Sequence, residues 1–307
     1  MFKNTRKWIV IALLFLLTMA ISTSALASNG DNKNDEDSID EKFGLPVVVY
    51  GSALTPAQKE EVRKLLGVKD PKMVKELTVS GEDLERYIKG NKHSNMYSSA
   101  KITLKDSGSG LYINQVTPEN ITEVSDEMYA NALLTAGIQD AVVDVASPVK
   151  VSGHSALVGI YKAYDEGEGT ELNTEHTEVA NEELSLASKL AQQEGLDKDK
   201  ISELLTEIKK EIAAQNPATK EDIEQIINEQ LKTLEIKLSP DDRQLLIDLF
   251  EKMRNLNINF DNVKSQLEDL SKEIQTRLEE AVGDKGFLQA IGDFFKNLIE
   301  GIKSLFS

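Results

Sequence analysis

Hydrophobic positions along this chain follow two different patterns, and the change between them lies near residue 165. Before that point, short apolar runs alternate with stretches in which apolar residues recur every three or four positions. The runs predict strands, and the recurring positions predict helices. After that point the helical spacing continues almost to the C-terminus. This order predicts an α+β or α/β fold, in which an N-terminal domain of layered strands and helices precedes a mostly α-helical C-terminal region.

Five short segments of the N-terminal region are predicted to be strands. The first, VVVY, is wholly apolar, as expected for a buried strand. The turn-rich sequence DSGSG at 106–110 separates the third segment from the fourth and predicts a β-hairpin. The five predicted strands span residues 47–50, 76–79, 100–105, 111–115 and 141–145.

Capping residues predict where the helices begin. Thr55 and Gln58 have the spacing of a capping box, with Pro56 at the first helical position. Ser152 is expected to cap the helix that follows it, because serine accepts hydrogen bonds from the free amides of a helix start. Further N-caps are predicted at Ser80, Ser125, Thr219 and Ser239.

Polar stretches divide the chain into predicted segments. Residues 28–42 contain six carboxylates and little to bury, so they are expected to be disordered. A second acidic stretch follows the last predicted strand-and-helix unit and is expected to be a linker. The predicted boundaries are 1–27 for a signal peptide, 28–43 for the acidic leader, 44–164 for the α/β domain, 165–178 for the linker, 179–285 for the helical domain and 286–307 for a C-terminal amphipathic helix.

The first 27 residues have the three parts of a secretory signal peptide. Basic residues precede an uncharged run at 8–21, and Ala25-Leu26-Ala27 is a small-residue cleavage site. The uncharged run has 14 residues, fewer than the roughly 20 that a membrane-spanning helix needs. We therefore expect cleavage after Ala27, and a secreted mature chain that begins at Ser28 and is extracellular or attached to the cell wall or membrane.

The mature chain is strongly acidic and has no cysteine. Cleavage removes three basic residues, so 35 basic residues become 32 against 52 acidic ones, and the net charge changes from −17 to −20. Such a polyanion repels nucleic acid, which we exclude as a partner. Without cysteine, the fold has neither disulfides nor thiolate zinc sites. No phosphate-binding loop, dinucleotide fingerprint or zinc-protease motif is present, so no cofactor or metal is expected.

The sequence GHSAL around Ser155 is close to the G-x-S-x-G nucleophile elbow of serine hydrolases. Leu157 stands where the tight turn of that elbow needs a glycine. A catalytic serine also needs a histidine base, and His93, His154 and His176 are all expected at the surface. We therefore expect Ser155 to be structural. Because 52 acidic residues make chance pairs common, no carboxylate pair can be singled out, and the catalytic residues stay unassigned.

Residues 286–307 predict an amphipathic helix about 30 Å long. Its apolar side chains could pack on the protein's own helical domain, or bind an envelope protein or the surface of a membrane. Both alternatives stay open. For the second, the contact residues are Phe287, Ile291, Phe294, Phe295, Leu298, Ile302, Leu305 and Phe306.

Four stretches within residues 47–260 carry a family resemblance: VVVYGSALTPAQKEEVRKLLGV, SSAKITLKDSGSGLYI, ITEVSDEMYANALLTAGIQDAVVDVASP and VSGHSALVGIYKAY. Together they resemble the YpuA-like exported bacterial proteins of unknown function, domain-of-unknown-function family 1002. The resemblance implies export and association with the cell envelope of endospore-forming bacteria, without an established chemistry. It also implies threonine and alanine at the positions of His154 and Ser155, which argues against a nucleophilic role for Ser155.

Two functions from different classes follow. The first is a non-enzymatic, envelope-associated protein that binds a partner or the membrane surface, and we favour it over an enzyme. The second is a hydrolase that acts on a cell-envelope polymer through carboxylates that the sequence does not identify. A deep cleft that holds two facing carboxylates with raised pKa values would favour the hydrolase.

Overall fold

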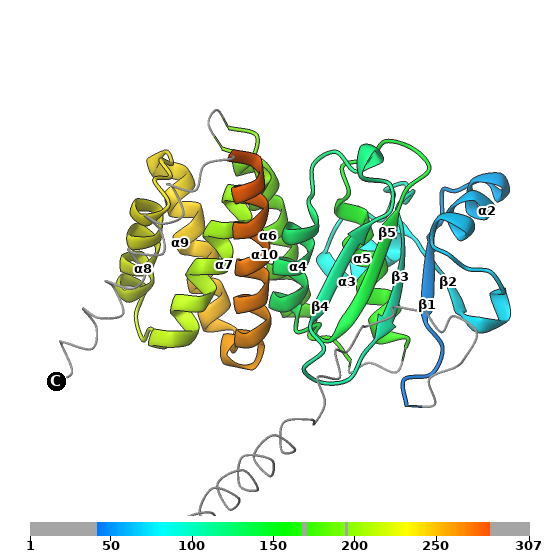
Figure 1. The fold of residues 1–307 in the computed structure, drawn as a ribbon, viewed down its shortest axis with the longest axis horizontal. Coiled ribbons are helices and arrows are strands. Elements are labelled where there is room, and N and C mark those ends of the chain that lie inside the picture. Colours follow the sequence, from blue (N-terminus) through cyan, green and yellow to red (C-terminus); the bar gives the residue numbers. More distant parts are fainter. Residues whose placement is uncertain (1–41, 168–170, 194–195, 283–307) are drawn as a thin grey trace, which may run out of the picture. The chain divides into compact units, whose positions relative to one another are not determined.

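The computed structural model of the chain describes residues 42–167, 171–193 and 196–282. All of these residues belong to one compact unit. The fold is α+β, as expected: the N-terminal half forms a five-stranded mixed sheet, and the C-terminal part is mostly helical (Figure 1). The predicted signal peptide, nearly all of the acidic leader and the predicted helix at 286–307 lie outside the described residues, and they stay predictions.

The sheet has the strand order β2-β1-β3-β5-β4, so β2 and β4 are its edges. β1 is parallel to β2 and antiparallel to β3, whereas β5 is antiparallel to β3 and parallel to β4. Each strand agrees with its predicted segment to within one residue at either end. The strands are β1 (Val47–Gly51), β2 (Lys75–Val79), β3 (Ser99–Leu104), β4 (Leu111–Gln115) and β5 (Ala141–Ala146).

The predicted hairpin of β3 and β4 is wrong, because β5 lies between these two strands. The DSGSG turn instead passes the N-terminal end of β5. There the carboxylate of Asp140 accepts hydrogen bonds from the amides of Gly108 (3.0 Å) and Gly110 (2.9 Å). The burial pattern explains the order of the strands. Alternate residues of β5 are fully buried, whereas β4 exposes Tyr112 and Asn114, so the more apolar strand takes the central place.

β1 is buried on both faces, which explains its unbroken apolar sequence. Val47 and Val49 belong to the large hydrophobic core, whereas Val48 and Tyr50 belong to a smaller one. The smaller core lies beneath α2 (Pro56–Leu65), which contributes Val62 to it. On the other face, α5 (His154–Asp165) packs across β1, β2 and β3, with α3 (Gly81–Ile88) beside it (Figure 1).

α4 (Asp126–Ala136) lies between the sheet and the remaining helices (Figure 1). It contacts β4 on one side and α6 and α7 on the other. Its residues from 127 to 136 are therefore all buried. The helices beyond it are α6 (Thr174–Leu190), α7 (Lys198–Gln215), α8 (Lys220–Thr233), α9 (Pro240–Asn255) and α10 (Lys264–Val282), and short 3₁₀ helices occur at Pro71–Met73, Pro118–Asn120 and Phe260–Val263.

The hydrophobic core is continuous across the predicted linker at 165–178, and α6 begins inside that linker, at Thr174. Polar groups also join the two regions. The ammonium of Lys209, which is fully buried, donates to Glu183 Oε1 (2.5 Å) and to the carbonyl of Asn131 (2.8 Å). Glu183 Oε2 accepts from Thr135 (2.6 Å). Because both Lys209 and Glu183 have partners in the neighbouring helices, α4, α6 and α7 are held in one arrangement.

Five of the predicted N-caps are confirmed. Each accepts a hydrogen bond from a backbone amide in the first turn of its own helix, and three of them complete capping boxes. The five are Thr55, Ser80, Ser125, Thr219 and Ser239.

The predicted cap at Ser152 is wrong, because α5 starts one residue later, with Gly153 at the N-cap. The backbone of Gly153 has a φ of 108°, in the region that favours glycine. A Cβ atom at this position would come within 2.7 Å of Ile121 and 2.8 Å of the Tyr129 hydroxyl. The same hydroxyl donates to the Gly153 carbonyl (2.6 Å). Tertiary packing therefore chooses this helix start over the serine cap.

Candidate functional site

Ser155 lies in the first turn of α5 and is half-buried. Its hydroxyl makes a hydrogen bond of 3.3 Å with the hydroxyl of Ser98. The imidazole of the adjacent His154 lies 3.9 Å from the carboxylate of Glu123, and burial lowers the pKa of His154. Two serine hydroxyls in contact do not activate one another, since neither is a base near neutral pH. The structural role of Ser155 stays a prediction.

The three histidines were all expected at the surface, and the structure agrees only for His93. His154 and His176 are half-buried. The imidazole Nε2 of His176 lies 3.4 Å from the carbonyl of Leu256, at the end of α9. The difference has a simple cause. Both residues lie in the first turn of a helix that packs on its neighbours, so the polar residues beside them in the sequence do not predict how exposed they are.

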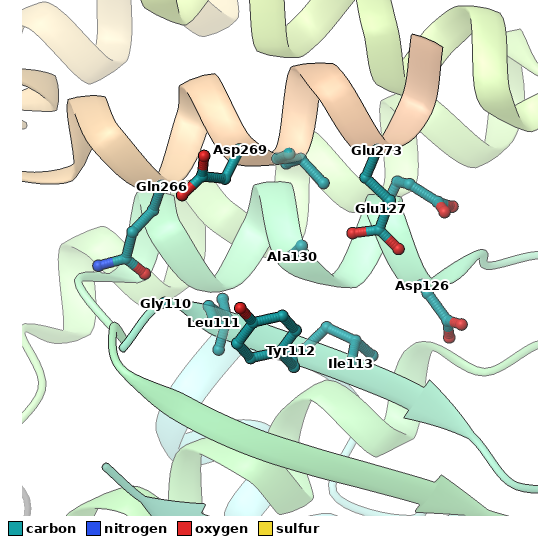
Figure 2. Close-up of a pocket in the computed structure, with 11 residues that line it drawn as sticks. Gly110, Leu111, Tyr112, Ile113, Asp126, Glu127, Ala130, Gln266, Asp269 and Glu273 are labelled. Atoms are coloured by element: carbon teal, nitrogen blue, oxygen red, sulfur yellow. The ribbon is translucent and has the colours of Figure 1, made fainter. Parts of the chain in front are cut away.

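A groove of about 260 Å³ runs along the outer edge of β4, where α10 passes α4 (Figure 2). We call it the β4 groove. Three elements line it: β4 with the residue before it, the start of α4, and one side of α10. The lining residues are Gly110, Leu111, Tyr112, Ile113, Asp126, Glu127, Ala130, Gln266, Asp269, Leu270 and Glu273.

The lining of the β4 groove is acidic, and none of its residues is basic. Asp269 and Glu273 are one helical turn apart on α10, and Asp126 and Glu127 come from the first turn of α4 (Figure 2). Arg277, next along α10, partly balances them. Its guanidinium lies 2.6 Å from Glu127, 3.5 Å from Glu273 and 3.9 Å from Asp126. The ammonium of Lys272 also lies 3.1 Å from the carboxylate of Asp269. Two cations therefore face four carboxylates, and the groove keeps a negative charge.

Asp126 has the most strongly shifted pKa among the lining residues. Burial, followed by the charge of neighbouring Glu127, raises the pKa of Asp126 to about 6. The positive charge of Arg277 and the amide of Gln115, 3.2 Å from the Asp126 carboxylate, act in the opposite direction. A carboxyl group in this state holds a proton more tightly than an exposed aspartate does, and it is stabilised when a cation approaches.

Two lining side chains offer buried acceptor atoms. Glu127 is 1% exposed and Gln266 is 8% exposed. Within the described part of the chain, neither oxygen of the Glu127 carboxylate has a hydrogen-bond partner, and the same is true of Gln266 Oε1. Arg277 is at ion-pair distance from Glu127 but is not oriented for a hydrogen bond. Buried acceptors favour a ligand that brings N–H donors.

Sequence reasoning missed this groove. Asp126 and Glu127 lie in the first turn of a helix, where the helix dipole stabilises carboxylates, so their position suggests no other role. Gln266, Asp269 and Glu273 recur at helical spacing next to the apolar stripe of α10, which is a signal visible in the sequence. That signal does not say which element the polar stripe faces. Only the packing of α10 across α4 brings it to the edge of the sheet.

The predicted contact residues of the C-terminal helix, from Phe287 to Phe306, lie outside the described residues. No helix in the described ranges is long and apolar enough to cross a membrane. The same part of the chain contains no group of three or more His, Cys, Asp or Glu side chains arranged to hold a metal ion.

Comparison with known proteins gives two matches. The family described as "Protein of unknown function (DUF1002)" matches residues 50–270. The "Uncharacterized protein YpuA" of Bacillus subtilis (strain 168) is 34% identical over 271 residues, which cover 87% of this chain and 91% of that relative. No solved structure matches the chain. Apart from Glu273, the residues that line the β4 groove fall within the range that the family covers.

Proposed function

The chain belongs to the DUF1002 family, and from that premise we propose that it is an exported, envelope-associated protein that acts by binding rather than by catalysis. Export is supported by the signal-peptide pattern of residues 1–27. A net charge of −17 before cleavage supports binding partners that are cationic or neutral. We also propose that the helix predicted at 286–307 contacts a partner or the membrane surface.

The observation that carries the binding proposal is the acidic lining of the β4 groove. Asp126, Asp269 and Glu273 lie around it, and Glu127 lies buried beside Arg277 with carboxylate oxygens that accept no hydrogen bond from the described residues. Only a group that carries both positive charge and N–H donors matches both features, and such groups are the side chains of lysine and arginine. We propose that the groove binds a basic side chain of a partner.

Titration of the mature chain with a short oligolysine peptide tests this binding. The double variant Asp269→Asn/Glu273→Gln removes two exposed charges from the α10 wall of the groove. We expect its dissociation constant for the peptide to rise by about tenfold at low salt, with a smaller change at high salt, because screening weakens exposed charge pairs.

The matched control is the double variant Glu221→Gln/Glu268→Gln. Glu268 is exposed on α10 next to Asp269 but does not line the groove, and Glu221 is exposed on α8. Both double variants change the net charge equally. Binding that weakens by the same factor in both would mean that the peptide responds to overall charge, and the groove proposal would fail.

One observation favours the alternative of an envelope-polymer hydrolase. Asp126 has a pKa of about 6 in a groove that also contains Glu127, Asp269 and Glu273. A raised pKa suits a carboxyl group that donates a proton to a leaving group. Incubation of the mature protein with purified peptidoglycan tests this idea. Release of soluble fragments by wild type, and its loss in Asp126→Asn, would replace the binding proposal by the enzymatic one.

A further inference from the structure

β4 is an edge strand, and its register shows which of its backbone groups face outward. The amide of Val116 donates to the carbonyl of Val145, and the carbonyl of Gly110 accepts from the amide of Ala141. In a parallel ladder, alternate residues direct both N–H and C=O to the same neighbour. The even-numbered residues of β4 therefore bond to β5, and the groups of Leu111 and Ile113 point away from the sheet.

The end of this outward row is marked by Asp126. The amide of Gln115, the next odd-numbered residue, donates to Asp126 Oδ1 (3.2 Å). This bond confirms that the N–H groups of odd-numbered residues point away from β5. It also occupies the outward N–H of Gln115, which is then not available to another strand. Among the described residues, nothing bonds to the outward N–H and C=O groups of Leu111 and Ile113, and both residues line the β4 groove.

An open strand edge of this kind pairs readily with another extended segment. The acidic leader of this chain is a poor candidate, since its six carboxylates would face the carboxylates of the groove. The C-terminal segment predicts a helix, which offers no free backbone groups. Charge complementarity instead favours a segment that carries lysine or arginine.

We propose that an extended, basic peptide segment of a partner protein adds to the edge of β4 as a further strand. Its backbone pairs with Leu111 and Ile113, and a basic side chain on the α4 side meets Glu127 beside the small side chain of Ala130. This inference rests on the proposed binding function and specifies its mode. Main-chain bonds supply affinity for any extended segment, and the acidic lining selects a basic one.

A pair of synthetic peptides tests the mode of binding. The first has about ten residues in which valine and lysine alternate, which favours an extended chain. The second has the same sequence and charge, but its central amide nitrogens are methylated and cannot donate. We expect methylation to weaken binding to the mature chain by about tenfold or more, because an added strand needs those donors.

A proline substitution tests the same edge from the protein side. Ile113→Pro removes an outward N–H and leaves the bonds between β4 and β5 in place, as prolines on edge strands do. We expect this variant to bind both peptides as weakly as wild type binds the methylated one. Thr78→Pro is the matched control: Thr78 is exposed on β2, and the bonds of Lys75 and Val79 to the β1 side place its N–H outward at the opposite edge.

The outcomes separate the two proposals. If both peptides bind equally well, and both weaken in Asp269→Asn/Glu273→Gln, the binding function stands and strand addition is overturned. If neither peptide binds, or if Asp269→Asn/Glu273→Gln binds the peptides as tightly as wild type does, the proposed function itself fails. Sedimentation of the protein without peptide identifies a second copy as the occupant if a dimer forms that Ile113→Pro abolishes, and that result also overturns the proposal. The methylation comparison decides the mode of binding even if Ile113→Pro does not fold.

Discussion

Arg277 shows how strongly a single residue affects the charge of the β4 groove. Its side chain is 42% exposed, yet it contacts carboxylates from two helices, among them Glu127, which is 1% exposed. A buried carboxylate is stable only when a cation or hydrogen bonds compensate it. Arg277 is therefore both a link between α10 and α4 and the group that a basic ligand would partly replace.

The raised pKa of Asp126 makes its contribution to stability depend on pH. A raised pKa means that the native state binds the proton more tightly than the unfolded state. The stabilisation is complete below the ordinary aspartate pKa of 3.8 and is lost as the pH rises through about 6. Asp126→Asn cannot ionise and keeps the acceptor for Gln115. We expect this variant to exceed wild type in stability by about 1–2 kcal/mol at neutral pH, a figure discounted for solvent contact, and by much less near pH 4.

Urea unfolding at the two pH values measures this difference. Glu268→Gln, at an exposed position outside the groove, serves as the control and should show no comparable pH dependence. If the stability difference between Asp126→Asn and wild type were the same at both pH values, the raised pKa of Asp126 would be contradicted.

Gly153 is predicted to be intolerant of a side chain. The backbone φ at this position is 108°, which strains any residue with a side chain, and an added Cβ would lie only 2.7–2.8 Å from Ile121 and Tyr129. We expect Gly153→Ala to lower the free energy of unfolding by about 2–4 kcal/mol, measured by thermal or urea unfolding. Gly108 also has a positive φ but has open space around it, so Gly108→Ala should cost only about 1 kcal/mol. Equal losses would show that the crowding at Gly153 is relieved.

Ser155→Ala is predicted to have little effect. The substitution removes one hydrogen bond of 3.3 Å between two hydroxyl groups, which contributes about 1 kcal/mol or less. Any activity or phenotype of the protein should change by no more than a few-fold. A loss of about 10³-fold or greater, as expected for a catalytic nucleophile, would return Ser155 to the active-site candidates.

At the scale of elements, the same polar or apolar pattern has different meanings in different surroundings. In α4 the polar residues Asn131 and Thr135 are buried, because α6 and α7 cover that side of the helix. The strand β4 alternates exposed and half-buried residues, as an edge strand does. Its neighbour in sequence, β3, is not its neighbour in the sheet, since the more apolar β5 takes the place between them.

Deletion of residues 286–307 tests the predicted C-terminal helix as a contact element. The charges within it, Asp293, Lys296, Glu300 and Lys303, sum to zero, so binding to a membrane would be hydrophobic and only weakly dependent on salt. We expect the truncated protein to keep its melting temperature and to lose binding to liposomes. A lower melting temperature, with exposed dye-binding surface and unchanged liposome binding, would show instead that the segment packs on the protein's own helices.

At the scale of the whole molecule, the sheet and the helices share one hydrophobic core. Lys209 of α7 and Glu183 of α6 form a buried ion pair, and α4 supplies its polar partners from the side that faces away from the sheet. Loss of one member of such a pair leaves a buried charge without compensation. The sheet and the helical region are therefore expected to unfold together.

Export of the whole chain gives the broadest prediction. The signal-peptide pattern predicts cleavage after Ala27. N-terminal sequencing of the protein from culture supernatant or the cell-wall fraction should start at Ser28. Recovery of a chain that still begins with Met1 from the membrane fraction would show that the segment is an uncleaved anchor.

The sequence by itself determined the class of fold, the five strands and five of the helix starts. Those features depend on local physics: the period of apolar residues follows from backbone geometry, and a serine or threonine cap bonds to amides of its own helix. Asp222, for example, completes the box with Thr219 within a single turn. The family resemblance could also be identified from the sequence, because it depends on the order of residues alone.

Only the tertiary structure decided the order of the strands, the start of α5 and the β4 groove. Each depends on residues far apart in the chain that compete for the same space or face one another. β5 displaces β4 from β3, Tyr129 selects Gly153 over Ser152, and α10 brings Asp269 to within reach of the edge of β4. In a chain with 52 acidic residues, these four carboxylates stand out only because packing gathers them around one groove. There, burial and the charge of Glu127 raise the pKa of Asp126, and the carboxylate of Glu127 is buried without a hydrogen bond in the described part of the chain.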